Sequence, residues 1–472
     1  MEFHVSLTGR DDLTGQIYQQ VKAAILDGRL RAGDALPPSR ELARRLAVAR
    51  NTVAAAYDRL TGEGFVAART GSGTFVLTAG FEEPPAAGGG RGPRPRDVWN
   101  HIEAPRPDAG DGYEFDFRVG MPDARLFPYA AWRRLLTRQF TPARIGSFAH
   151  DGAAAHPGLA AALARHIGIS RAVRATAEDV LVTNGAQQAI DLVGRVLLAP
   201  GDVVAVEDPG YFGPRHLLQS LGAEVAGVPV DAEGIVVDRI PDTAKLVYVT
   251  PSHQFPLGMP MSLPRRTALL AWAERTGAVL IEDDYDSEFR FAGRPIEPLQ
   301  NIDRGDRVIY VGSLSKVLMP MLRVGFLIAP PSLRPALRAA KYVSDWSSTR
   351  PIQGALAEFI DEGLLARHIR KTRTEYAARH ERITTVLRRD FAGVLVPVPV
   401  AAGLHLAAYL PDGTDDKAVW RRATDAGVGL YPLSPFQLTG AGRPGLVIGY
   451  GGIALSEIDE GLRRLRACVQ PG

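Results

Sequence analysis

Short, uninterrupted apolar segments limit the fold of this chain more than any other feature of its sequence. The clearest lie at residues 180–182, 203–206, 246–249, 278–281 and 308–311, and helical patterns separate them. Apolar runs of this length without alternation are typical of strands buried on both faces, with helices covering a mostly parallel sheet. The sequence therefore predicts an α/β domain from residue 113 to residue 472.

Composition places the chain among ordinary globular proteins. A length of 472 residues predicts two or three domains, and a hydrophobic share of 46% allows a large core. The net charge of +3 is small, so any nucleic-acid surface must be local. The single cysteine, Cys468, excludes a disulfide within the chain and fits a reducing compartment. We find no signal peptide and no apolar run of about 18 residues, so we expect a cytoplasmic protein without a membrane span.

Residues 79–112 differ in composition from the segments on either side. They contain Pro84, Pro85, three consecutive glycines at 88–90 and further prolines at 93 and 95. Such a segment lacks the apolar surface needed to order itself, so we interpret it as a flexible linker. It separates an N-terminal domain, residues 1–78, from the α/β domain, residues 113–472.

The N-terminal domain combines helical patterns with turn signals. Apolar residues at helical spacing predict a helix over residues 13–26, and Ser39 is expected to cap a short helix that ends at Leu46. A second short helix begins at Arg50, and two helices at this spacing predict a helix-turn-helix. Residues 69–76 predict a hairpin with a glycine-containing tip, which would be the wing of a winged helix-turn-helix.

Three motifs of this domain, residues 37–43, 50–53 and 71–76, carry a family resemblance. Together they resemble the GntR family of bacterial regulators over residues 12–77. The resemblance implies that double-stranded operator DNA is contacted by Arg40, Arg50, Asn51, Thr52 and the wing near Gly73. Independently, four arginines gather around the predicted turn, where phosphates would lie. The alternative is a small helical interaction domain with solvated arginines.

In the α/β domain, a lysine follows a buried strand and small hydroxyl residues. Ser313, Ser315 and Lys316 come just after the strand at 308–311, and the whole chain has only six lysines. The strand at 278–281 continues into residues 282–285, Glu-Asp-Asp-Tyr, and Arg323 lies downstream. An amine, a carboxylate, a phenol, hydroxyls and a guanidinium are the groups that pyridoxal 5'-phosphate (PLP) requires from a protein. The alternative is a solvated lysine at a strand end.

Three of these side chains have predicted tasks at the reactive part of the cofactor. Lys316 would form the Schiff base with the aldehyde, because a lysine amine can lose its proton whereas arginine stays charged. Asp283 would accept a hydrogen bond from the pyridine nitrogen, and Tyr285 would donate one to the phenolate oxygen. Asp284 and Asp286 are interpreted as solvated or structural.

Other residues are predicted to bind the phosphate and the ring. Arg323, Ser313 and Ser315 would bind the phosphate, together with free N–H groups where a helix opens near Gly185, Ala186 and Gln187. Tyr211 is a candidate for stacking on one ring face, and His253 would line the far side of the ring. No metal site is predicted.

Residues 113–465 resemble the fold-type I aminotransferases, with further matching stretches at 126–128, 156–159 and 282–289. With the GntR-like domain in front, the whole chain resembles the MocR subfamily, in which a winged helix-turn-helix is fused to an aminotransferase-like domain. This resemblance implies a homodimer, often with each DNA-binding domain on the large domain of the partner.

One departure from the aminotransferase pattern concerns the substrate carboxylate. Aminotransferases usually hold it with an arginine on a late strand, but here that strand, residues 445–450, has Leu446 or Val447 at the arginine position. Arg443 precedes Pro444, and the first arginine after Tyr211 is Arg215. A site without this arginine lacks a bidentate anchor, which puts amino-acid recognition and transamination in doubt.

These observations favour a PLP-binding transcriptional regulator. The missing carboxylate anchor favours a regulator that senses PLP itself and controls vitamin B6 synthesis genes. One alternative is a MocR-type regulator that responds to an amino acid such as GABA, taurine or a D-alanine-type ligand. Another is an active PLP-dependent aminotransferase with a DNA-binding appendage. The sequence leaves open the effector, the operator, the sign of regulation and any residual transaminase turnover.

Overall fold

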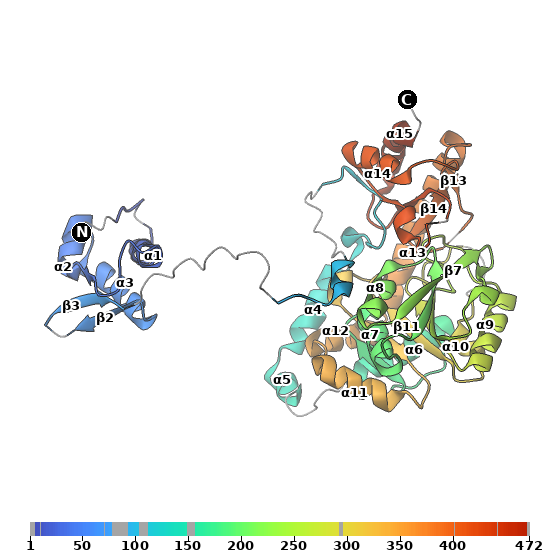
Figure 1. Ribbon diagram of the computed structural model, residues 1–472, viewed down its shortest axis with the longest axis horizontal. Coiled ribbons are helices and arrows are strands. Elements are labelled where there is room, and N and C mark those ends of the chain that lie inside the picture. The colour runs from blue at the N-terminus through green and yellow to red at the C-terminus, as the bar shows by residue number, and fades with distance from the viewer. Residues whose placement is uncertain are drawn as a thin grey trace. The chain divides into compact units, whose positions relative to one another are not determined.

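The computed structural model describes residues 5–9, 11–69, 71–77, 93–102, 112–148, 156–291, 296–400, 402–440 and 442–469. The chain divides into two compact units, Met1–Pro95 and Arg96–Gly472, drawn in Figure 1. The boundary lies inside the segment predicted to be a linker, most of which falls outside the described residues. Residues 93–102 of this segment are described. They contain a 3₁₀ helix, η1 (Asp97–Asn100), and Arg96 donates a 2.7 Å hydrogen bond to the carbonyl oxygen of Ser220.

The first unit is a three-helix domain with a small sheet. Its elements are α1 (Leu13–Leu26), β1 (Ala35–Leu36), α2 (Ser39–Leu46), α3 (Arg50–Gly62), β2 (Val66–Arg69) and β3 (Gly73–Val76). The three strands pair antiparallel in the order β1-β3-β2, so β2 and β3 form the predicted hairpin. Ile17, Val21, Val53 and Leu60 are fully buried between the helices. The periodicity that predicted α1 therefore marks the face that fills this core.

The prediction that Ser39 caps α2 is wrong. Ser39 is the first residue of the helix, and Pro38 occupies the capping position with extended backbone angles and no side-chain hydrogen bond to the helix. Proline fixes φ near the value it has here, so it sets the direction of the chain without a capping oxygen. The predicted end of α2 at Leu46 and the start of α3 at Arg50 are confirmed.

The second unit is built on an eight-stranded sheet. Its strands are β5 (Val180–Thr183), β6 (Val203–Asp208), β7 (Glu224–Asp231), β8 (Gly234–Ile235), β9 (Ala244–Val249), β10 (Val279–Asp284), β11 (Val308–Ser313) and β12 (Gly325–Ile328). They lie in the order β5-β12-β11-β10-β9-β6-β7-β8, and only β12 and β8 run antiparallel to their neighbours. The predicted mostly parallel sheet is confirmed, and all five apolar segments are strands.

Helices cover both faces of this sheet. Leu246 and Tyr248 of β9 lie in a core with α7 (Ala186–Leu197) and α11 (Arg334–Asp345). Val247 and Val249 point the other way, into a core with α9 (Leu263–Thr276). Because alternate residues of one strand are apolar on both faces, the strand sequence shows no polar alternation.

The large part of the unit is completed by seven further helices. They are α4 (Tyr129–Gln139), α5 (Pro142–Phe148), α6 (Pro157–Arg171), α8 (Phe212–Ser220), α10 (Leu299–Ile302), α12 (Arg350–Asp361) and α13 (Leu364–Asp390).

A smaller lobe follows the sheet. A second sheet has the order β13 (Val396–Pro397), β14 (His405–Tyr409), β17 (Gly445–Gly449) and β16 (Tyr431–Pro432), and β4 (Phe115–Asp116) pairs with β15 (Val428–Gly429). Helices α14 (Asp416–Asp425) and α15 (Ile458–Val469) accompany them. Among the described residues, no helix is both long and apolar enough to cross a membrane.

Candidate functional site

Lys316 lies just beyond the end of β11, with a half-buried side chain. Its Nζ donates a 2.8 Å hydrogen bond to the carbonyl oxygen of Gly120. Burial lowers the pKa of Lys316, while the negative charges of Asp286 and Asp283 oppose this shift. A lowered pKa increases the fraction of neutral amine, which is the form that attacks a carbonyl group.

Asp283 lies near the end of β10, the strand next to β11, opposite Val311 in the sheet register. Its Oδ2 accepts a 2.6 Å hydrogen bond from the hydroxyl group of Tyr248. Its Oδ1 is buried and has no hydrogen-bond partner among the residues that the structure describes. Burial raises the pKa of Asp283 to about 7. A buried carboxylate oxygen without a partner is costly, and a cationic N–H donor would satisfy it.

Arg323 and the turn before α7 are packed together. The guanidinium group of Arg323 donates a 2.8 Å hydrogen bond to the carbonyl oxygen of Asn184. Gly185 has a φ of +81°, and a Cβ atom there would lie 3.1 Å from Nη2 of Arg323. Helix α7 begins at the next residue, Ala186, followed by Gln187. The guanidinium therefore meets the free N–H groups of a helix start, an arrangement that suits a phosphate.

Ser313 is the last residue of β11, and Ser315 lies between this strand and Lys316. The Oγ of Ser313 accepts a 3.2 Å hydrogen bond from the backbone N–H of Ser315, so one hydroxyl already stabilises this turn. Ser313 is buried and Ser315 is half-buried.

Tyr211 and Tyr285 stand on different elements around this region. Tyr211 directly precedes α8, is 39% exposed, and contacts the ring of Phe255 edge-on at 5.5 Å. Burial raises the pKa of its phenol, and the negative charge of Asp283 adds to the shift. Tyr285 is the first residue after β10, and its hydroxyl group donates a 2.9 Å hydrogen bond to the carbonyl oxygen of His253.

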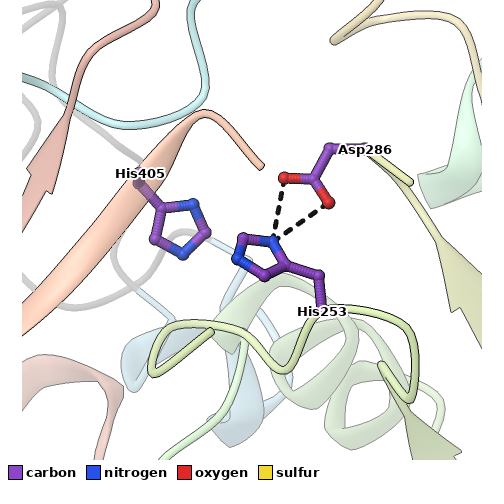
Figure 2. A group of neighbouring side chains, drawn as sticks. All are labelled: His253, Asp286 and His405. Atoms are coloured by element: carbon purple, nitrogen blue, oxygen red, sulfur yellow. Dashed lines mark hydrogen bonds and ion pairs between the residues drawn. The ribbon is translucent and has the colours of Figure 1, made fainter. Parts of the chain in front are cut away.

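His253 belongs to a buried group that sequence reasoning missed in part. Figure 2 shows His253 between Asp286 and His405, with Nδ1 of His253 lying 3.1 and 3.0 Å from the two carboxylate oxygens of Asp286. Asp286 was expected to be solvated or structural, yet it is buried beside the candidate site. His405 comes from β14, about 150 residues downstream of His253, and no local motif marked it. One ligand atom from each of the three lies within 4.8 Å of the others.

The candidate anchor position on β17 is apolar. Leu446 and Val447 are fully buried in β17. Arg443 lies over the ring of Tyr409 at 4.3 Å and pairs with Asp412 at 3.5 Å. The exposed arginine is therefore occupied by groups on its own lobe, and the strand position itself is apolar.

The candidate DNA-contacting residues lie at the starts of two helices and on the wing. Arg40 is on the first turn of α2, and Arg50, Asn51 and Thr52 open α3. Arg40, Arg50 and Asn51 are exposed, whereas Thr52 is half-buried. Gly73 begins β3 at the exposed tip of the hairpin, with a φ of +110° that favours glycine.

Comparisons with known proteins agree with this two-part organisation. Residues 13–76 match the model for bacterial regulatory proteins of the gntR family, and residues 145–462 match aminotransferase class I and II. The chain is 36% identical to a probable rhizopine catabolism regulatory protein MocR of Rhizobium meliloti, over 96% of this chain and 92% of that protein. It belongs to the MocR subfamily of GntR-type regulators.

Another MocR-type relative and a solved structure complete the comparison. The pyridoxine biosynthesis transcriptional regulator PdxR of Corynebacterium glutamicum is 32% identical, over 92% of this chain and 91% of that protein. The second unit resembles a Pyrococcus horikoshii kynurenine aminotransferase, with a TM-score of 0.70 and 26% identity over 76% of this chain and 91% of that one. The predicted fold, a GntR-type helix-turn-helix joined to a fold-type I aminotransferase domain, is confirmed, and the cofactor of this class is PLP.

Proposed function

We propose that this MocR-type regulator binds PLP at Lys316 and that PLP changes its affinity for operator DNA. The observation that carries the proposal is the unpartnered, buried Oδ1 of Asp283 next to a strand that leads to Lys316. PLP supplies a ring that can withdraw electrons and an aldehyde that condenses with an amine. Asp283 would hold the ring nitrogen, Lys316 the aldehyde carbon and Arg323 the phosphate.

The same geometry disfavours efficient transamination. Turnover requires an amino acid held so that its reacting bond is aligned, and a carboxylate anchor supplies much of that orientation. At the expected anchor the chain has buried Leu446 and Val447, and Arg443 is engaged with Tyr409 and Asp412. A site that keeps its cofactor groups but has no arginine at the described position on β17 suits a sensor of the cofactor. We therefore propose that this regulator acts in the cytoplasm and controls vitamin B6 synthesis genes.

We infer that helix α8 transmits the response from the candidate site to the chain that leads into the second unit. Tyr211 directly precedes α8, and the ring of Phe212, the first residue of α8, stacks on Phe436 at 5.8 Å. At the other end of α8, the carbonyl oxygen of Ser220 accepts a hydrogen bond from Arg96, and η1 contacts this helix. Arg96 is the first residue of the second unit, so α8 joins the candidate PLP site to the incoming chain.

We also propose that the regulator is a homodimer. Helix α11 and the 3₁₀ helix η4 (Pro320–Leu322) carry large exposed apolar side chains, including Val343 at 83% and Met321 at 76% exposure. At the C-terminal end of α11, the ring of Tyr342 contacts the ring of Trp346, the residue after the helix, at 6.1 Å. Exposed apolar groups of this size are unusual on a monomer surface and are typical of protein interfaces. Sedimentation of the parent protein and of Val343→Asp tests this assignment, because a charge at a buried dimer contact would favour the monomer.

The decisive experiment measures operator binding against PLP concentration. An operator is first selected from random double-stranded DNA with the purified full chain. We expect PLP alone to change the affinity for this operator, and Lys316→Ala to reduce the response while the protein stays folded. Operator affinity that ignores PLP and responds to GABA or taurine would replace this proposal with an amino-acid-sensing regulator. Fast transamination of a common amino acid would replace it with an enzyme.

A further inference from the structure

We propose that Asp286, acting through His253, positions the Tyr285 hydroxyl group to donate a hydrogen bond to the phenolate oxygen of PLP. Asp286 would then be a positioning residue, because it touches His253 rather than the cofactor. The inference rests on the proposed PLP binding, and it assigns a role to a residue that the sequence suggested was merely solvated or structural.

The geometry of the chain of contacts is direct. Both Asp286 oxygens lie within 3.1 Å of Nδ1 of His253, and both side chains are 2% exposed. The oxygen of Tyr285 lies 3.0 Å from the same Nδ1 and 2.9 Å from the carbonyl oxygen of His253. Three consecutive groups, carboxylate, imidazole and phenol, therefore share one ring nitrogen.

The carboxylate decides which tautomer the imidazole adopts. An ionised carboxylate only accepts hydrogen bonds, so Nδ1 of His253 must carry a hydrogen toward Asp286. Nδ1 then has no lone pair for the Tyr285 proton, and without the cofactor that proton goes to the backbone carbonyl of His253. The charged phenolate oxygen of PLP is a stronger acceptor than this neutral carbonyl, so the proton would turn to it once PLP is bound. Without Asp286, Nδ1 could accept the phenol proton and turn it away from the cofactor.

The surrounding chain fixes this arrangement. A Cβ atom on Gly403 would lie 2.0 Å from Cε1 of His253 and 2.6 Å from Oδ2 of Asp286, so backbone packs directly on the pair. The hydroxyl group of Tyr450 donates to the carbonyl oxygen of Gly403 at 2.9 Å and holds that backbone in place. His405 contacts the His253 ring at 4.9 Å but bonds to the Pro256 carbonyl, outside the chain of contacts.

The test compares Asp286→Ala, Tyr285→Phe and the double variant, each as the full chain with PLP. A donor to the phenolate oxygen weakens the hold of that oxygen on the imine proton, so its loss raises the pH at which the absorbance of the bound cofactor changes. We expect both single variants to raise this pH and to weaken PLP binding by about tenfold, as for one charged hydrogen bond. The double variant should bind PLP as Tyr285→Phe does, because both changes remove the same interaction.

The direction of the pH shift separates positioning from a simple charge effect. Tyr285 is also faced by Asp283, Glu207 and Tyr450, and these groups remain in every variant. If the Asp286 charge acted directly on the imine, removing that negative charge would lower the pH of the transition instead. A lower or unchanged pH, or additive losses in the double variant, would overturn the inference. A parent protein that never shows bound-cofactor absorbance would instead refute PLP binding.

Discussion

The hydroxyl group of Tyr248 binds Oδ2 of Asp283 at 2.6 Å and leaves Oδ1 of the same buried carboxylate without a partner among the described residues. The phenol belongs to β9 and the carboxylate to β10, so the two strands aim them at the same point in the core. A protein that only had to be stable would gain from an uncharged side chain there. The arrangement is instead suited to a cationic ligand group.

This relationship predicts that Asp283→Asn raises the stability of the cofactor-free protein and weakens PLP binding. Burial raises the pKa of Asp283 to about 7, above the ordinary value of about 4. Between these pH values the folded state keeps a proton that the unfolded state releases, so the stability of the cofactor-free protein falls as pH rises. We expect Asp283→Asn to raise the free energy of unfolding by about 3 kcal/mol more at pH 8 than at pH 5, with weaker PLP binding at both.

Urea unfolding of the cofactor-free full chain at the two pH values measures this difference. Asp191→Asn is the matched control, because Asp191 pairs with Arg195 at 2.7 Å on the surface of α7. The control should change stability little at either pH. An equal effect of Asp283→Asn at pH 5 and pH 8 would show that this carboxyl titrates normally in the fold.

Lys316 should be the only lysine that borohydride fixes to PLP. Its amine has a lowered pKa and lies on the loop beside Asp283, whereas the buried amine of Lys341 forms an ion pair with Asp345 and bonds to Ser348 at 3.1 Å. Peptide mapping after reduction should place the label on the peptide with Lys316, and Lys316→Ala should abolish it. A label on Lys341 would refute the site assignment.

The sequence was sufficient for the elements that local patterns encode. The apolar runs became strands, and the motifs around Asp283, Lys316 and Arg323 lie on neighbouring strands and turns because the ends of adjacent strands share one edge. His405 could not be predicted in this way, because β14 belongs to another sheet and only tertiary packing brings it to His253. The role of Asp286 was missed because a carboxylate beside other acidic residues gives no local sign of burial.

Arg50 should contribute directly to operator binding. It is exposed at the start of α3, and among the described residues no hydrogen bond or ion pair holds its guanidinium group. Arg50→Ala should weaken operator binding by about 1–3 kcal/mol if the contact is bidentate to a base. If Arg50 contacts only a phosphate, Arg50→Ala would instead reduce the slope of log affinity against log salt concentration by about one.

The matched control for Arg50 is Arg59 on the same helix. Its guanidinium lies 3.8 Å from the centre of the Tyr18 ring and pairs with Glu63, so it is engaged within the domain. Arg59→Ala should lower the stability of the domain and leave operator affinity unchanged under conditions where the protein is folded. Equal losses of affinity from both variants would mean that operator affinity depends only on the net charge of the domain. Arg50 would then make no specific contact with DNA.

Arg96 should carry the response to PLP without contributing to either binding site. It donates to the carbonyl oxygen of Ser220 at 2.7 Å, at the far end of the helix that begins beside Tyr211. Arg96→Ala should leave PLP affinity and cofactor-free operator affinity within about twofold, and should reduce the factor by which PLP changes operator affinity. Arg94→Ala, which removes the same charge from an exposed neighbouring residue, should keep that factor.

Linkage gives this last prediction an independent check. If PLP changes operator affinity by a certain factor, operator DNA must change PLP affinity by the same factor. In the parent protein both factors, measured by titrating one ligand at saturating levels of the other, should agree. Arg96→Ala should lower both factors together, because it removes the connection and leaves the sites intact. A loss of PLP affinity or of cofactor-free operator affinity in Arg96→Ala would mean that a binding site was damaged. An unchanged factor would mean that α8 does not carry the response to PLP.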